Sequence, residues 1–208
     1  AYLHPCRFVP DITVLDDLGL EPSDKYVVMR FVSWKASHDI GHKGISLENK
    51  LAAVRKFSSL ARVFISAEGE LPPELEEYRL KTEPHRIHDV LAYASLLWTD
   101  SFTMPSECSV LGTPSVVIHN SRSFPLEIQR DKYGLCFTYS ESHDNQLLAI
   151  EKGESLLRTP GLKEEWLSRR NRFISDNVDL TSFLLWFFWN WPESFSTLKN
   201  NPDYQKMF

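Results

Sequence analysis

Polar side chains crowd one short stretch of the chain, at a point where the sequence predicts the start of a helix. Asp100 follows the apolar run 97–99, and Ser101 and Thr103 come directly after it. The first turn of a helix carries unpaired N–H groups and the positive end of the helix dipole, so it can hold a phosphate. The hydroxyls of Ser101 and Thr103 could add donors there. Glu107, one turn on and on roughly the same face, could accept hydrogen bonds from a ribose diol.

The same residues also have a simpler interpretation. Ser101 and Thr103 could merely cap the helix, because hydroxyl side chains accept hydrogen bonds from the first N–H groups. Glu107 could be a solvated acid that the helix dipole favours. Residue types and spacing alone leave both interpretations open.

The elements that must position these side chains are a strand, a helix and a second strand. Pro105 suits the first turn of the helix, whereas Gly112 and Pro114 suit its end and the stop beyond it. The run 115–118 is compact and apolar, as is typical of a strand buried on both faces of a parallel sheet. Strand, helix and strand in this order form a βαβ unit.

The rest of the chain repeats this alternation. Further strands are expected at 26–32, 62–66 and 135–139, and the main helices at 47–60, 89–95, 126–132, 145–157 and 162–177. Such alternation predicts an α/β fold, a Rossmann-like layered domain with a mostly parallel sheet. A final helix is expected at 179–191, capped by Asp179 or Thr181, and the tail 192–208 is expected to lie over the surface without regular structure.

Two loops carry further candidates. Arg122, in the loop after 115–118, is a natural phosphate or carboxylate partner, although loop arginines are commonly just solvated. His38, Asp39 and His42 superficially suggest a metal site. Histidines at this spacing share a face only on a helix, and Gly41 disfavours one, so we expect no metal and no cofactor.

Composition limits the function further. A chain of 208 residues is most simply one domain, and its net charge of −5 argues against a general nucleic-acid surface. Three cysteines cannot form a fully paired disulfide framework, which fits a reducing, cytoplasmic location. The apolar core 183–189 of the last helix is too short for a membrane span, which needs about 20 residues.

Several motifs resemble a known group of enzymes. They are LHPCRFVPD (3–11), RFVSWKASHDIGHKG (30–44), RVFISAEGELP (62–72), EPHRIHDVLAYASLL (83–97) and TDSFTMPSECSVLGTPSV (99–116). The last resembles the diphosphate- and ribose-binding segment of two-domain nucleotide-sugar enzymes with the GT-B fold, especially UDP-N-acetylglucosamine 2-epimerases. The chain looks closer still to a prokaryotic family of epimerase-like or glycosyltransferase-like proteins. In one respect it departs from the epimerases, which carry a glycine pair where this chain has Phe102 and Thr103.

The resemblance implies one half of a GT-B fold, with an interdomain connector (1–23), a nucleotide-sugar-binding domain (24–178) and a terminal aromatic helix and tail (179–208). It implies a UDP-type nucleotide sugar as ligand. Ser33 and His38 would lie in the loop that borders the cleft, although His38 could equally be a loop histidine bonded to a backbone carbonyl. Arg86 and Ile87 would lie near the nucleotide base.

The resemblance also implies a missing N-terminal domain, because the chain begins inside what resembles the connector. Catalytic groups in such folds come from both domains, so this chain alone is expected to bind and not to turn over. A non-catalytic nucleotide-sugar binding or regulatory protein, or a scaffold, are the alternatives. The aromatic last helix would pack on the N-terminal domain, and in the isolated chain self-association, such as a homodimer, or the tail would cover it.

Overall fold

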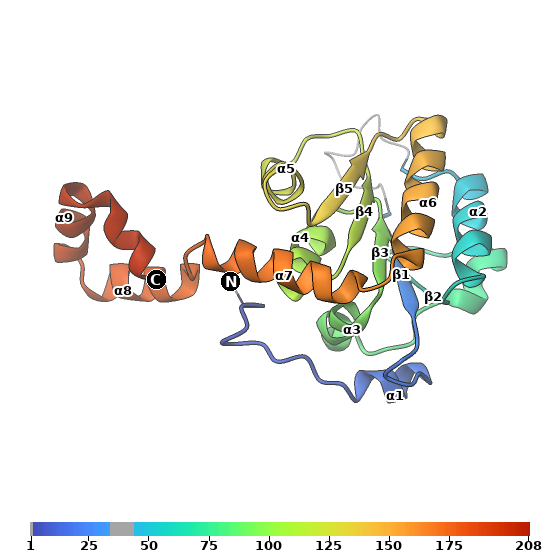
Figure 1. Ribbon diagram of the computed structural model, residues 1–208, viewed down its shortest axis with the longest axis horizontal. Coiled ribbons are helices and arrows are strands. Elements are labelled where there is room, and N and C mark those ends of the chain that lie inside the picture. The colour runs from blue at the N-terminus through green and yellow to red at the C-terminus, as the bar shows by residue number, and fades with distance from the viewer. Residues whose placement is uncertain (1, 34–43) are drawn as a thin grey trace.

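A five-stranded parallel sheet forms the centre of the molecule. The computed structural model describes residues 2–33 and 44–208. The strands are β1 (Tyr26–Phe31), β2 (Arg62–Ala67), β3 (Leu96–Thr99), β4 (Ser115–Ile118) and β5 (Cys136–Tyr139). They pair in the order β2-β1-β3-β4-β5, and every pairing is parallel within the described residues (Figure 1). The predicted α/β class and all five predicted strands are confirmed.

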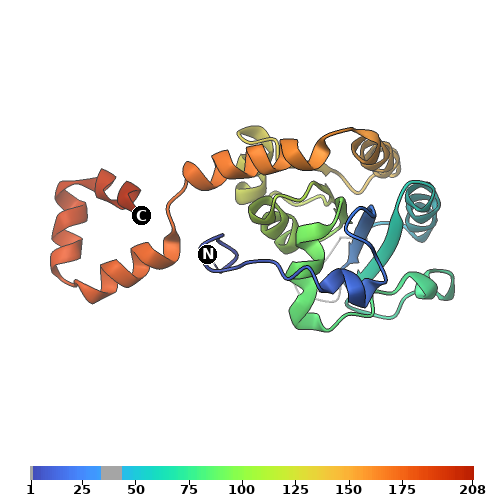
Figure 2. The same ribbon diagram turned by 60° about the horizontal axis from the view of Figure 1, so that its bottom comes forward.

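Helices cover both faces of this sheet. The helices of the sheet domain are α1 (Val14–Leu18), α2 (Leu47–Ser58), α3 (Ile87–Tyr93), α4 (Thr103–Leu111), α5 (Phe124–Asp131), α6 (His143–Arg158) and α7 (Leu162–Ser175), and two more follow, α8 (Leu180–Trp189) and α9 (Glu193–Asn200). Helices α2 and α6 lie side by side on one face, whereas α3 and α4 lie on the other (Figures 1 and 2).

The strand sequences explain why two layers of helices are needed. Val27 and Met29 of β1 are buried in the hydrophobic cluster under α2 and α6, together with Phe57. Tyr26 and Val28, which point the opposite way in an extended strand, are buried in the second cluster. Each face therefore has its own hydrophobic core, as expected for strands that read as continuous apolar runs.

The end of α4 agrees with its sequence. Gly112 has φ of 80°, a left-handed conformation that glycine adopts without steric cost, and its N–H donates to the Cys108 carbonyl at 2.8 Å. A Cβ there would lie 2.9 Å from a methyl carbon of Leu167. The chain then turns directly into β4, which fixes the βαβ unit.

The prediction of an irregular tail over the surface was wrong. Residues 193–200 form α9 and Pro202–Met207 form a 3₁₀ helix. The tail is ordered because it folds back on α8: the Trp186 ring centroid lies 4.9 Å from that of Tyr204 and 5.1 Å from that of Phe208. The helix α9 is only eight residues long, and Pro192 before it is its main sequence marker. Its helical signal in the sequence is therefore weak.

The terminal helices α8 and α9 project from the sheet domain as a separate lobe (Figures 1 and 2). Asp179 caps α8 as predicted, because its Oδ1 accepts from the N–H groups of Thr181 and Ser182. Within the described ranges, no helix has the length and hydrophobicity needed to cross a membrane.

Candidate functional site

The turn from β3 into α4 is held by hydrogen bonds that are partly buried. Asp100 is almost fully buried, and its Oδ1 accepts from the Val32 N–H at 3.0 Å. The Thr99 hydroxyl donates to the Arg30 carbonyl and accepts from the Ser101 N–H, both at 2.9 Å. Asp100 therefore positions the turn by its hydrogen bond to Val32, which directly follows the neighbouring strand β1.

The start of α4 is open for an anion. Its N-cap residue is Phe102, and no side chain caps the helix, so Ser101 and Thr103 do not act as caps. The first N–H groups of a helix have no partner inside the helix, and the dipole favours negative charge beside them. Thr103 is exposed, and the first turn contains no acidic residue. This arrangement leaves a positive helix end at the carboxyl edge of the sheet.

Lys50 adds a positive charge near this turn. It lies on α2, with its Nζ 4.4 Å from the centre of the Phe31 ring. Burial lowers the pKa of Lys50, and the nearby Asp100 carboxylate opposes that shift. Sequence reasoning missed Lys50 because a lysine on an amphipathic helix normally faces solvent.

The Glu107 carboxylate contacts two other segments of the chain. Its Oε1 accepts a 2.5 Å hydrogen bond from the Tyr2 hydroxyl, and its Oε2 lies 3.4 Å from His88 Nε2. The bond to Glu107, helped by burial and by the carboxylate charge, raises the pKa of Tyr2 to about 12. The phenol is therefore protonated at neutral pH and occupies one oxygen of the carboxylate.

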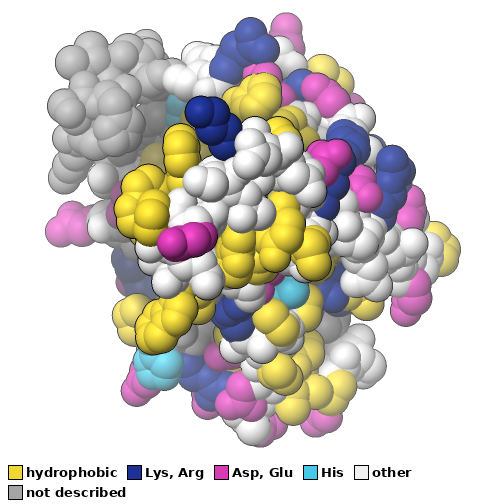
Figure 3. All heavy atoms as spheres, turned by 90° about the vertical axis from the view of Figure 1, so that its left-hand side faces the viewer, with side chains coloured by type: hydrophobic (Ala, Val, Ile, Leu, Met, Phe, Trp, Pro, Cys, Tyr) yellow, Lys and Arg dark blue, Asp and Glu magenta, His cyan; other side chains and the backbone are white. Residues whose placement is uncertain are grey.

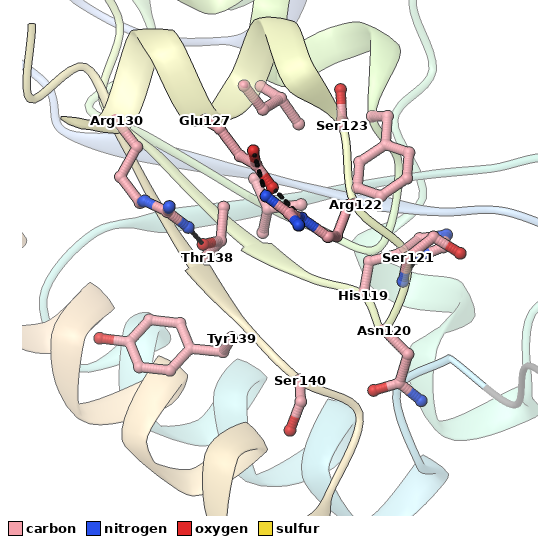
Figure 4. Close-up of a pocket in the computed structure, with 13 residues that line it drawn as sticks. His119, Asn120, Ser121, Arg122, Ser123, Glu127, Arg130, Thr138, Tyr139 and Ser140 are labelled. Atoms are coloured by element: carbon pink, nitrogen blue, oxygen red, sulfur yellow. Dashed lines mark hydrogen bonds and ion pairs between the residues drawn. The ribbon is translucent and has the colours of Figure 1, made fainter. Parts of the chain in front are cut away.

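A pocket of about 210 Å³ lies beside the start of α4, and we call it the β4–β5 pocket (Figure 4). Arg122 projects into it, but its guanidinium forms two bonds to the Glu127 carboxylate, at 2.7 and 2.9 Å. Arg130, on one side of the pocket, donates to the Thr138 hydroxyl (Figure 4) and also pairs with Asp131. The predicted Arg122 thus lines a pocket and is already paired with an acid.

Phe102, the N-cap residue of α4, lines the β4–β5 pocket. Its ring stacks on that of His119, with centroids 4.0 Å apart and planes 30° from parallel. The chain therefore has an aromatic ring in the lining of the β4–β5 pocket at the first of the two positions where its sequence departs from the motif it resembles. The Phe102 backbone has an ordinary right-handed conformation, so it needs no glycine.

A second pocket, of about 300 Å³, lies on the other side of the α4 start, and we call it the β1–β2 pocket. Ile87 and Met104 line it, together with Arg30, which bonds to Ser66 and Glu68 at 2.8 and 2.7 Å. The Thr82 hydroxyl in this pocket is buried and has no hydrogen-bond partner within the described residues. Unpaired buried polar atoms are rare in folded proteins, and within the described residues the Trp98 indole nitrogen and the Ser115 hydroxyl share this property.

The other predicted site residues have different surroundings. Arg86 donates to Asp11, Asp17 and Thr13, so its side chain fastens the connector to the domain. The Ser33 N–H donates to Glu68 at 3.1 Å. His38 lies outside the described residues, as do Asp39 and His42 of the rejected metal site.

The structure therefore groups the candidates around one helix end. Ser101 and Thr103 lie at the start of α4, Ile87 lines the β1–β2 pocket and Arg122 lines the β4–β5 pocket. Sequence reasoning missed Thr82 as a pocket residue. The sequence marks it only by Pro84, which follows two residues later.

An open parallel sheet of this order, with pockets at the carboxyl ends of its strands, is the architecture of one half of a GT-B protein. A UDP-N-acetylglucosamine 2-epimerase structure matches with a TM-score of 0.51 and 17% identity, over 87% of this chain and 47% of that one. A putative UDP-N-acetylglucosamine 2-epimerase from Listeria monocytogenes matches with a TM-score of 0.51 and 15% identity, over 79% and 46%. The spinosyn forosaminyltransferase SpnP matches with a TM-score of 0.50 and 16% identity, over 80% and 44%.

These matches establish the fold alone. The chain spans about half the length of the solved structures it matches. No family model matches the sequence, and no curated protein matches it either.

Proposed function

We propose that this chain is the nucleotide-sugar-binding domain of a GT-B-type epimerase-like or glycosyltransferase-like enzyme. The observation that carries the proposal is the uncapped, acid-free start of α4 between two pockets at the carboxyl edge of the sheet. Ligands of open α/β sheets bind at this edge, and a diphosphate is the group that a helix N-terminus favours.

The two pockets suggest how a nucleotide sugar lies. The base enters the β1–β2 pocket and pairs with the unpartnered Thr82 hydroxyl. The diphosphate lies at the N–H groups of α4, and the sugar extends toward the β4–β5 pocket, where His119 and Arg122 offer polar contacts. The ribose hydroxyls reach Glu107, which requires the Tyr2 hydroxyl to give way.

Catalysis requires a second domain across the cleft, as in the GT-B architecture, so the isolated chain binds its ligand without turnover. The free thiols of Cys6, Cys108 and Cys136 support a reducing, cytoplasmic compartment. A regulatory binder is the second candidate. The Phe102 ring in the lining of the β4–β5 pocket favours it, because that pocket would have to admit the reacting sugar.

Glu107→Gln tests the ribose contact. It should weaken the binding of UDP by about 1–3 kcal/mol, the usual loss for a hydrogen bond to a charged group. Binding of 2′,3′-dideoxy-UDP should change much less, because that nucleotide lacks both hydroxyls. Isothermal titration calorimetry on both nucleotides measures the difference.

Tyr2→Phe is the matched control, because it removes only the hydroxyl that occupies Glu107. This variant should bind UDP more tightly than the parent chain. If Glu107→Gln lost the same binding free energy for UDP as for the dideoxy nucleotide, Glu107 would have no ribose contact. Its carboxylate would then bind only His88 and Tyr2.

We further propose that a second copy of the chain covers the projecting lobe. Part of the predicted aromatic surface is satisfied internally, because Trp186 packs against the tail. Leu185, Phe188 and Trp189 remain 67, 70 and 90% exposed, and Figure 3 views the molecule from this side, with hydrophobic side chains in the foreground. A contiguous exposed apolar surface of this kind is uncommon in a monomer.

Sedimentation velocity at micromolar concentration should therefore show a dimer or a larger species. Replacing Phe188 and Trp189 by serine should give monomer, whereas Trp186→Phe should leave the association unchanged because Trp186 faces the tail. A monomeric parent chain would contradict the proposed self-association and would leave the nucleotide proposal untouched.

A further inference from the structure

Three side chains with metal-binding atoms meet where the connector touches the projecting lobe. His4 Nδ1, Cys6 Sγ and a carboxylate oxygen of Asp179 all lie within 4.8 Å of one another. His4 Nδ1 is 2.8 Å from Cys6 Sγ, and Cys6 Sγ is 4.0 Å from Asp179 Oδ2. The cluster lies outside the pockets that flank α4.

Local structure holds these groups in place from both sides. The N–H groups of Arg7 and Phe8 donate to the His4 carbonyl at 2.8 and 3.0 Å, and the resulting turn brings His4 and Cys6 together. Asp179 is fixed by its capping role, in which Oδ1 faces the helix N–H groups. Its second oxygen, Oδ2, accepts from the Ser182 hydroxyl at 2.7 Å and lies 4.0 Å from Cys6 Sγ.

The donor set matches one kind of cation. A thiolate, an imidazole nitrogen and a carboxylate oxygen are the ligands of Zn²⁺, which takes three protein ligands and a water in open sites. Cys6 is exposed, so an ion can enter from solvent. Magnesium and calcium are disfavoured, because they select oxygen ligands.

Arg7 is the competing cation in this cluster. Its Nη1 lies 2.6 Å from Asp179 Oδ2 and 3.2 Å from Cys6 Sγ, and its Nη2 donates to Ser182 at 2.9 Å. A guanidinium in contact with the Asp179 carboxylate and the Cys6 sulfur gives both groups a partner when no metal is bound. A divalent ion must displace this guanidinium, so Arg7 lowers the affinity of the site for the ion.

We propose that His4, Cys6 and Asp179 form a Zn²⁺ site, with water as the fourth ligand, that fastens the connector to the start of α8. Zinc binding moves the Arg7 guanidinium away from Asp179 and releases the thiol proton of Cys6 to solvent. The site joins residues that are 173 positions apart in the chain, so the ion orders the projecting lobe against the domain.

Co²⁺ is the probe for this site, because a cobalt–thiolate bond gives a charge-transfer absorption that oxygen-only sites lack. Titration of the full reduced chain should give this absorption and a one-to-one stoichiometry, and Zn²⁺ should abolish it by competition. Cys6→Ser should lose the absorption, although Cys108 and Cys136 remain. Both of these are buried, which makes them unavailable to the probe.

Two further variants separate ligation from folding. Asp179→Asn keeps an N-cap side chain, so α8 is retained, but it should weaken Zn²⁺ binding at least tenfold. Arg7→Gln removes the competing charge and should tighten binding severalfold. Circular dichroism checks that each variant is folded. The proposal is overturned by an unchanged cobalt spectrum in Cys6→Ser, or by weaker Zn²⁺ binding in folded Arg7→Gln.

Discussion

Replacing Thr103 by aspartate should weaken UDP binding more than about a hundredfold, because two charges about 4 Å apart repel by roughly 4 kcal/mol at an effective dielectric of 20. The new carboxylate would lie in the first turn of α4, where the proposed diphosphate binds. Thr103 is exposed, so the aspartate fits without a clash. Calorimetric titration with UDP measures the loss.

The same change separates binding from folding. An acid at a helix N-terminus stabilises the helix by about 0.3–1 kcal/mol, so the free energy of unfolding should not fall. Thr103→Asn has the same shape without the charge and should retain most of the affinity. If the aspartate variant bound UDP as tightly as the asparagine variant, the diphosphate could not lie at α4.

The largest effect on stability is expected at Trp166. Replacement by alanine should lower the free energy of unfolding by about 3–5 kcal/mol, the usual loss for a large buried aromatic side chain. Trp166 is 2% exposed, and its indole N–H donates to the Leu135 carbonyl at 3.0 Å. The side chain therefore anchors α7 to the segment that enters β5. Urea unfolding followed by circular dichroism measures the change.

Trp166→Phe is the comparison for this prediction. Phenylalanine retains much of the apolar contact with Phe137 but leaves the Leu135 carbonyl without its donor, so we expect a smaller loss than in the alanine variant. An alanine variant as stable as the phenylalanine variant would show that α7 is held mainly by other contacts, such as that of Lys163 with the Ala92 carbonyl.

The sheet could be predicted from the sequence because its determinants are local. Continuous apolar runs give the strands, and Gly112 and Pro114 mark the end of α4 within a few residues of it. The helix start was identified for the same reason. Each of these signals depends on residues close together in the chain.

The surroundings of the site could not be predicted, because they depend on contacts between distant segments. Glu107 meets Tyr2, which is 105 positions away, and Arg86 meets Asp11, which is 75 positions away. The order of the tail could not be predicted from the sequence, because the tail is stabilised by aromatic contacts with α8 and not by its own helical pattern.

The hydrogen bond between Tyr2 and Glu107 has a thermodynamic consequence for a ligand that needs the same carboxylate. The apparent dissociation constant is the intrinsic one divided by the fraction of molecules in which the tyrosine has moved away. Linkage is reciprocal, so a nucleotide bound as proposed should loosen the first residues of the connector by the same factor. The same short segment carries His4 and Cys6, the proposed Zn²⁺ ligands. Zn²⁺ should hold this segment in place, whereas a nucleotide should release it. We therefore expect each ligand to weaken the binding of the other.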